Sequence, residues 1–557
     1  MPNKPPKYIR HGASYAGIVE EAQTLHQLQR LHWIFYAVKY GNNHVPVRRD
    51  TAVIASAFPD PNVMLLAPAF QKPESIPERF ANGSSGPTDQ YELEYYLQSL
   101  ASRNEWMSFA YADFQSEEGH SFPYVYLSES NTQSTTAING SSKVRVYLQG
   151  AVHGNEPAGD QSLLALLGKM DANQTWTASL LEKVDIMILP RYNPDGVAYF
   201  QRTLATNFDP NRDHIKLARQ QTRDLKQLLN SFAPHVAVDM HEYGASSTYG
   251  GNYNHASDGL FSAAKNLNIH PDIRRMSEEV FATNIASAME GNDLRWEPYV
   301  TGNTNSTPGS PILFDEAGSD GKIGRNAMGL TQCITFLCEM RGIGIADQEF
   351  ARRTYAGLTM AEAIIQTAAD QAEQVFDTIE SGIEDFISSQ DEIVITDYSD
   401  KIEREYSFVD KSNGSVVQVP INFTVTTPVN ANLTRARPEA YLIPKAWPDV
   451  AERLRVYGLE VQTLTNTFRG EVEALNITSA EFDSGYYEGT VLLTVTTETV
   501  NKEVELPAGS FMVSTRQKNA ALAFIALEPE NIDSLVAFNL VPVEEGDEYP
   551  IYRVMAV

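Results

Sequence analysis

Cysteine and basic residues are scarce in this sequence, and both shortages limit what the protein can be. The 557-residue chain has two cysteines, Cys333 and Cys338. If the segment around them is a strand, they lie on opposite faces, roughly 16 Å apart. They cannot then form a disulfide with each other, and we expect buried core thiols. The chain has 43 Lys and Arg against 71 Asp and Glu, a formal net charge of −28. This charge argues against a nucleic-acid partner or an anionic membrane surface, because both require a basic face.

Long apolar runs are also missing. No stretch of about 18 apolar residues occurs, which argues against membrane insertion through a transmembrane helix. The first residues, MPNKPPKYIRHGASY, lack the apolar segment of a signal peptide. Asn-x-Ser/Thr sequences nevertheless recur along the chain, and the strong negative charge suits an extracellular or saline setting. We therefore expect a secreted or periplasmic protein, with a cytoplasmic location as the alternative.

What the chain does contain predicts three domains. A hydrophobic content of 42% and a charged content of 20% describe a folded protein, and the length exceeds one ordinary core. Residues 1–89 carry a helical pattern around 18–41 and then a Pro-rich stretch, which predicts an N-terminal extension packed on the next domain. Residues 90–388 alternate strands with helices, which predicts an α/β fold with a mixed, largely parallel sheet and helices on both faces. Residues 389–557 alternate with period two between turns, which predicts a β-rich domain.

Four apolar runs of the middle domain carry unusual polar residues at or after their carboxyl ends. These runs are VRVYLQG (144–150), VDIMILP (184–190), VAVDM (236–240) and CITFLCEM (333–340). The polar residues, in the order of the runs, are His153 and Glu156; Asn193, Arg202, Asp209, Asn211 and Arg212; His241; and Glu339 with Arg341. Because one parallel sheet brings its carboxyl strand ends to one edge, we expect these side chains to converge.

The convergent residue types predict metal-assisted hydrolysis. Two histidines and one glutamate form the ligand set of a catalytic zinc that keeps an open position. Glu339 is a further carboxylate that can accept a proton from a zinc-bound water. Arg202 and Arg212 supply fixed positive charge for a developing oxyanion or a substrate carboxylate.

Each residue also has an ordinary structural interpretation. His153 alone is more often a satisfied core or surface histidine, and Glu156 alone is an acid at a helix N-terminus. Arg212 pairs in this interpretation with Asp209 or Asp213, and Arg341 is the structural partner of Glu339. The sequence NPDG at 193–196 is then simply a turn.

The ordered set of these pieces resembles the zinc carboxypeptidase family, peptidase family M14, in a larger microbial-type form with a C-terminal β-rich domain. The matching pieces are HGNE, NPDG, Arg202, DPNR, DMH and FLCEMRG, over roughly residues 90–385. The resemblance implies that residues 90–388 are the catalytic domain, with one zinc ion per site bound by His153, Glu156 and His241. It also implies that Glu339 is the general base and that Arg202 stabilises the tetrahedral oxyanion.

The resemblance extends to substrate binding. It implies that Asn211 and Arg212 hold the terminal carboxylate of the substrate and that Asp209 orients His153 from outside the ligand set. One departure concerns the tyrosine that caps the substrate in classical members, because the segment FDEAGSDGKIGRNAMGL before Glu339 has none. Tyr299, further upstream, is the candidate substitute.

The sequence therefore predicts a metallocarboxypeptidase, a hydrolase that cleaves the C-terminal bond of peptides with a free C-terminal carboxylate. Two alternatives stay open at this point. The first is a zinc amidohydrolase or deacylase acting on acyl-amino acids or cell-wall peptides. The second is an inactive binding protein with a degenerate site, against which the full set of ligands and base argues.

Overall fold

The computed structural model describes residues 49–71, 88–129 and 142–556. The helical pattern predicted around residues 18–41 lies outside these ranges. At the N-terminal end of the described chain, two short helices, α2 (Ala52–Ala55) and α3 (Pro68–Gln71), precede the main domain. No helix of the described chain is both long and apolar enough to cross a membrane.

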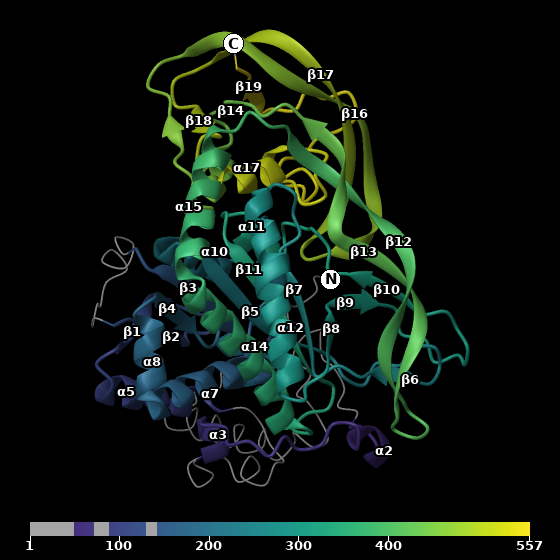
Figure 1. The fold of residues 1–557 in the computed structure, drawn as a ribbon. Coiled ribbons are helices and arrows are strands. Elements are labelled where there is room, and N and C mark those ends of the chain that lie inside the picture. The colour runs from purple at the N-terminus through teal and green to yellow at the C-terminus, as the bar shows by residue number, and fades with distance from the viewer. Residues whose placement is uncertain (1–48, 72–87, 130–141, 557) are drawn as a thin grey trace, which may run out of the picture.

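An eight-stranded mixed sheet forms the centre of the main domain, as predicted (Figure 1). Its spatial order is β1-β2-β4-β3-β5-β11-β7-β8. The strands are β1 (Met107–Gln115), β2 (Ser121–Leu127), β3 (Val144–Gly150), β4 (Val184–Leu189), β5 (Val236–Gly244), β7 (Gly259–Ala263), β8 (Trp296–Pro298) and β11 (Ile334–Ile343). The central strands β4, β3, β5 and β11 are parallel, whereas β1 with β2, β2 with β4, and β7 with β11 pair antiparallel. The edge strand β8 pairs parallel with β7. The four predicted apolar runs are these four central strands.

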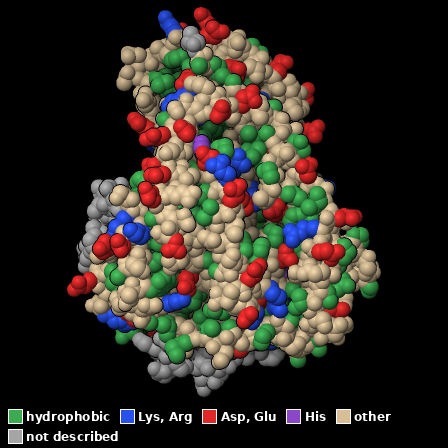
Figure 2. Space-filling view, in the orientation of Figure 1, with side chains coloured by type: hydrophobic (Ala, Val, Ile, Leu, Met, Phe, Trp, Pro, Cys, Tyr) green, Lys and Arg blue, Asp and Glu red, His purple; other side chains and the backbone are tan. Residues whose placement is uncertain are grey.

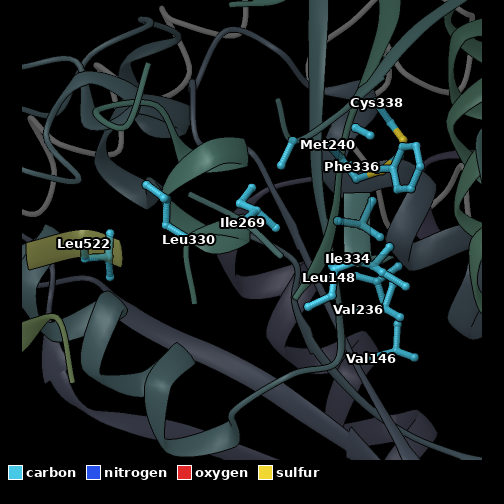
Figure 3. Close-up of a cluster of buried hydrophobic side chains, with 14 of the residues drawn as sticks. Val146, Leu148, Val236, Met240, Ile269, Leu330, Ile334, Phe336, Cys338 and Leu522 are labelled. Carbon is cyan, nitrogen blue, oxygen red and sulfur yellow. The ribbon is translucent and has the colours of Figure 1, made fainter. Parts of the chain in front are cut away.

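Both faces of the central strands are covered, which is why they read as continuous apolar runs. Val146 and Leu148 of β3 join a core cluster with residues of α7 (Ala158–Ala172) and α14 (Phe350–Asp370), and Figure 3 shows part of this cluster. Tyr147 points the other way, into a second cluster with residues of α10 (Gln220–Phe232). Cys338 belongs to the first cluster and Cys333 to the second, and both are free, buried thiols as predicted.

The remaining helices of this domain flank the sheet. They are α5 (Gln90–Arg103), α8 (Gln174–Leu181), α9 (Pro194–Tyr199), the short η1 (Pro210–Arg212), α11 (Pro271–Met276), the π-helical η2 (Ser277–Ala282), α12 (Thr283–Gly291), α13 (Gly324–Gly329) and α15 (Ala372–Ser388). The apolar residues of 214–232 recur at helical spacing and predict a helix over this whole segment, but α10 begins only at Gln220. The Asp213 carboxylate accepts the backbone N–H groups of Ala218 and Arg219 at 2.8 and 3.0 Å, which holds the preceding residues in a turn.

The stretch between the third and fourth apolar runs is rich in Gly, Asn and Ser, which predicts a long loop, and this prediction was wrong. Besides the helices and strands above, it contains three short strands, β6 (Tyr253–His255), β9 (Val300–Gly302) and β10 (Leu313–Glu316). β6 and β10 pair with a hairpin from the later part of the chain, and β9 pairs with β10. Together they form a five-stranded sheet, in the order β6-β12-β13-β10-β9, with β12 (Ile393–Asp410) and β13 (Val416–Arg435).

The last part of the chain is rich in β-structure, as predicted. A six-stranded sheet, in the order β15-β18-β14-β19-β16-β17, lies at the upper end of Figure 1. Its strands are β14 (Ala440–Ile443), β15 (Gln462–Thr463), β16 (Phe468–Tyr487), β17 (Thr490–Leu506), β18 (Phe511–Ser514) and β19 (Tyr552–Val554), accompanied by the helices α16 (Pro448–Val456) and α17 (Ala520–Leu527). Leu522 of α17 belongs to the same core cluster as Val146 and Leu148 (Figure 3). The domain boundaries at 89/90 and 388/389 stay predictions, since strands and core are shared across the second.

Candidate metal centre and active site

The loop after β3 brings His153 and Glu156 to the carboxyl edge of the sheet. The chain turns at Ala151, whose φ is 51°, and Pro157 then forms the N-cap of α7. Gly154 lies against the backbone of the first turn of α9, where a Cβ would overlap the carbonyl carbon of Gly196. The glycine in HGNE is therefore required by the NPDG segment, which packs directly against it.

His153, Glu156 and His241 converge on one point. All three are buried, and their ligand atoms lie within 4.8 Å of one another. The Nδ1 atom of His153 lies 2.7 Å from Glu156 Oε1, and the Nδ1 atom of His241 lies 2.9 Å from Glu156 Oε2. The two Nδ1 atoms are 3.1 Å apart. Burial opposes ionisation of Glu156, but the two imidazoles outweigh it and hold the pKa of this carboxyl well below its ordinary range.

The opposite nitrogen of each ring faces a buried carboxylate. His153 Nε2 lies 3.0 Å from Asp209 Oδ1, and His241 Nε2 lies 3.0 Å from Asp239 Oδ2. If each Nε2 carries the proton toward its carboxylate, both Nδ1 lone pairs face the Glu156 carboxylate, a donor set that suits a zinc ion. Asp239 was not predicted, although its spacing of two residues from His241 on a strand places both on one face.

Arg202 lies beside this cluster. Its Nε donates to Asp209 Oδ2 at 2.9 Å, and its Nη1 donates to Glu156 Oε1 at 3.4 Å. Burial alone would lower the pKa of Arg202, but Asp209 and Glu156 outweigh it and raise the pKa. The guanidinium is therefore a permanent cation on the rim of the candidate metal centre.

Glu339 stands next to His241 in the parallel pairing of β11 with β5. Its side chain is 7% exposed and, within the described chain, forms no hydrogen bond or ion pair. Burial raises the pKa of Glu339 to about 8, with His241 opposing the shift and Glu156 adding to it. Arg341 is not its partner, because that guanidinium pairs with Asp50 at 2.7 Å and with Glu349 at 2.8 Å.

Asn211 and Arg212 lie in η1, on the same side of the site. Asn211 Oδ1 accepts the backbone N–H of Gly324 at 2.6 Å, which fixes its side chain against α13. Arg212 donates to the carbonyl of Asn211 at 2.8 Å and forms no ion pair within the described chain. The structural alternative, an ion pair with Asp209 or Asp213, is therefore not formed.

A cavity of about 550 Å³ joins these groups. The predicted residues that line it are His153, Glu156, Arg202, Asn211, Arg212 and Glu339. Tyr299 also lines it, between β8 and β9, and burial together with Glu339 raises the pKa of its hydroxyl while Arg212 opposes the rise. Arg325, in the first turn of α13, lines the cavity as well and was missed, because nothing in its sequence context marks it.

One strand that pairs with the later part of the chain, and one turn from that part, complete the surroundings. Asp315 and Glu316 of β10 line the cavity, and β10 pairs with β13. The turn between β16 and β17 reaches the same region, where Glu488 Oε2 accepts the backbone N–H of Asp209 at 2.8 Å. The carbonyl of Glu488 also accepts from Lys216 Nζ at 2.7 Å. The later part of the chain therefore helps to position the candidate site.

Known proteins resemble the part of the chain that carries the candidate site. Residues 93–373 match the family model for zinc carboxypeptidases, peptidase family M14. The chain is 54% identical to "Carboxypeptidase 2" of Trichophyton tonsurans over 521 residues, which cover 93% of this chain and 96% of that protein. It is 55% identical to "Probable carboxypeptidase 2" of Arthroderma benhamiae over 502 residues, which cover 90% of this chain and 95% of that protein. A metallo-carboxypeptidase structure from Burkholderia cenocepacia aligns with 50% of this chain and 70% of its own, at 15% identity and a TM-score of 0.38.

Proposed function

The chain belongs to the zinc carboxypeptidase family, and from this premise we propose a zinc-dependent hydrolysis in which His153, Glu156 and His241 hold the metal. The protein is accordingly a metallocarboxypeptidase. One observation carries the ligand assignment: two imidazole Nδ1 atoms 3.1 Å apart share a single carboxylate. When bound, one zinc ion per site supplies a Lewis acid that polarises a water molecule and the scissile carbonyl.

In this proposal each side chain around the metal has a separate role in the reaction. Glu339 accepts a proton from the attacking water on its carboxylate and then passes it to the departing amine, a role supported by its position beside His241 on the cavity wall. Arg202, fixed by Asp209, stabilises the negative charge that develops on the carbonyl oxygen. Asp209 and Asp239 keep the two histidine rings in one tautomer and one orientation.

Asn211 and Arg212 bind the free C-terminal carboxylate of the peptide. An Arg fork pairs with a carboxylate through two parallel hydrogen bonds, and Arg212 is a cavity-lining cation without a carboxylate partner in the described chain. An amidated chain end is neutral there and leaves this guanidinium unpaired, which is costly.

The test compares peptides that differ only at the chain end. We expect free-ended peptides to lose C-terminal residues and amidated peptides to be poor substrates. Arg212→Ala should lower kcat/KM for free-ended peptides at least about tenfold, as expected for a lost charged hydrogen bond, with zinc content unchanged by elemental analysis. Equal cleavage of both peptide classes would reject the carboxypeptidase assignment of this site and favour the amidohydrolase alternative.

We further propose that the protein acts outside the cytoplasm, as a secreted or periplasmic enzyme. The support is compositional: the net charge of −28 and the recurring Asn-x-Ser/Thr sequences. Figure 2 shows acidic side chains spread over the visible face rather than gathered in one patch, as expected for a solvated surface. Fractionation of the natural source, with activity measured in medium and cell extract, tests this location.

A further inference from the structure

Arg325 is a buried cation on the cavity wall that the chemistry above does not use. Its side chain is 2% exposed. Its Nη2 donates to the carbonyl of Gly318 at 2.5 Å, whereas its Nε is buried without a hydrogen-bond partner. Within the described chain no carboxylate forms an ion pair with it. A guanidinium buried in this way is costly unless a ligand brings the opposite charge.

The acidic groups nearest in sequence are already paired elsewhere. Lys322, three residues earlier, contacts Asp320 at 2.8 Å and Asp533 at 2.9 Å. Glu316 accepts from the backbone N–H of Thr426 at 2.7 Å. These contacts leave Arg325 without an ion-pair partner in the described chain, although the more distant charges of Asp320, Glu339 and Asp239 oppose part of the effect of its burial.

Arg325 and the proposed carboxylate-binding residues belong to one wall of the cavity. The hydrogen bond from Gly324 N–H to Asn211 Oδ1 joins the first turn of α13 to η1, which carries Arg212. Arg212 and Arg325 both line the cavity, and both charges act on the hydroxyl of Tyr299, which lies between β8 and β9. Two cations without carboxylate partners therefore lie close to one bound chain end.

We propose that Arg325 binds a carboxylate on the side chain of the C-terminal residue, so that the enzyme prefers peptides ending in Asp or Glu. This inference rests on the proposed function, in which Arg212 takes the main-chain carboxylate. A C-terminal acidic residue carries two carboxylates on one residue, and the cavity offers two guanidiniums.

The acidic residues that line the cavity do not favour a basic substrate residue instead. Asp315 accepts from Thr424 Oγ1 at 2.6 Å. Glu316 accepts from Thr427 Oγ1 at 2.6 Å and lies 3.5 Å from Lys265 Nζ. Both carboxylates already have polar partners, whereas the Nε of Arg325 has none.

The experiment uses four peptides identical except for a free C-terminal Glu, Gln, Leu or Lys. For the wild-type enzyme we expect kcat/KM for the Glu peptide to exceed that for the Gln peptide at least about tenfold, the scale of a charged hydrogen bond. In Arg325→Gln this ratio should fall to about one, mainly through loss on the Glu peptide. Arg325→Lys, which keeps the charge, should retain part of the preference.

Lys322→Gln is the matched control, because it removes a cation three residues away that already pairs with Asp320 and Asp533. We expect this variant to keep the Glu/Gln ratio of the wild type. Melting temperature and zinc content are measured on every variant, so that a folding defect is recognised.

Two results would overturn the inference. The first is a wild-type enzyme that cleaves the Glu and Gln peptides equally well. The second is an Arg325→Gln variant that slows all four peptides by the same factor, which would place Arg325 on the main-chain carboxylate or in packing alone. Failure to cleave any free-ended peptide would instead reject the proposed function itself.

Discussion

Glu339, the proposed general base, gives the first prediction at the scale of single residues. It is buried beside His241 and forms no hydrogen bond within the described chain. Glu339→Gln keeps the shape of the side chain but removes its capacity to accept a proton. We expect turnover to fall at least about 10²-fold, the usual scale for a lost general base, while the zinc content stays the same. Steady-state kinetics with elemental analysis checks this, and near-normal turnover would move the base to another group, with Glu242 next in line.

Asp239 gives a second prediction at the residue scale. Its carboxylate lies 3.0 Å from His241 Nε2 and accepts from Gln149 Nε2 at 3.0 Å. Asp239→Asn keeps the size of the side chain but no longer selects the ring tautomer that presents Nδ1 to the metal. We expect zinc affinity, measured by competition with a chelator, to fall roughly 10- to 100-fold. Asp209→Asn is the matched variant on His153, and unchanged affinity in Asp239→Asn would limit Asp239 to a packing role.

At the scale of elements, the β16–β17 hairpin is predicted to support substrate binding. Its turn residue Glu488 accepts the backbone N–H of Asp209, at the start of the loop that carries Asn211 and Arg212. Glu488→Ala removes this acceptor, and one hydrogen bond contributes about 0.5–1.5 kcal/mol. We expect KM for free-ended peptides to rise roughly 2- to 12-fold with little change in kcat.

Two further variants make this effect specific. Glu488→Gln retains an acceptor oxygen and should restore most of the affinity. Glu481→Ala, at an exposed position of β16 in the same hairpin, should leave KM unaltered. A KM for Glu488→Ala equal to that of the wild type would show that the hairpin turn only packs against the site.

The elements also show which parts of the fold the sequence could predict. Strands β3, β4, β5 and β11 were predicted because burial on both faces leaves an uninterrupted apolar run. Strands β6, β9 and β10 were missed because each has only three or four residues. β6 and β10 exist as strands through pairing with β12 and β13, about 100 or more residues away in the sequence, and β9 pairs in turn with β10.

Some residues of the candidate site could likewise be predicted from the sequence, whereas others could not. His153 and His241 were found because each follows a predicted apolar run, although the structure extends β5 past residue 240 and places His241 inside it. Asp239 lies inside a strand and reads as a residue of an apolar run, although the structure turns it toward His241. Arg325 depends on a short helix and on the hydrogen bond from Gly324 to Asn211, neither of which has a pattern in the sequence.

At the scale of the whole molecule, His255 is predicted to affect stability at acid pH. It lies in the five-stranded sheet, which combines early and late strands of the chain. His255 of β6 pairs with Phe408 of β12 and stacks on Phe314, with ring centroids 5.1 Å apart. It is 3% exposed, and burial, with a smaller effect of Arg341, lowers its pKa to about 3. The unfolded chain, with a histidine pKa of about 6.5, therefore binds more protons than the folded chain between these two values. Stability from this group is complete above pH of about 6.5 and is lost as the pH falls.

His255→Phe removes the proton uptake and keeps a ring in the aromatic cluster. Relative to this variant, the free energy of unfolding of the wild type should fall by about 1.4 kcal/mol for each pH unit below about 6.5. Urea denaturation of both proteins between pH 7 and pH 5 gives the difference directly. Parallel pH profiles would mean that His255 does not titrate on unfolding in this range.

The five-stranded sheet combines strands from early and late parts of the chain, which has a consequence for the order in which the site is completed during synthesis. The last proposed catalytic residue to leave the ribosome is Glu339, but β10, which lines the cavity, gains its neighbour β13 some 80–100 residues later. The turn at Glu488 is synthesised later still. Such long-range pairings form late in folding because distant segments must first meet. A nascent chain that ends just after Glu339 therefore has all the proposed catalytic residues but lacks β13 beside the cavity. We expect hydrolysis only after the late strands have been synthesised.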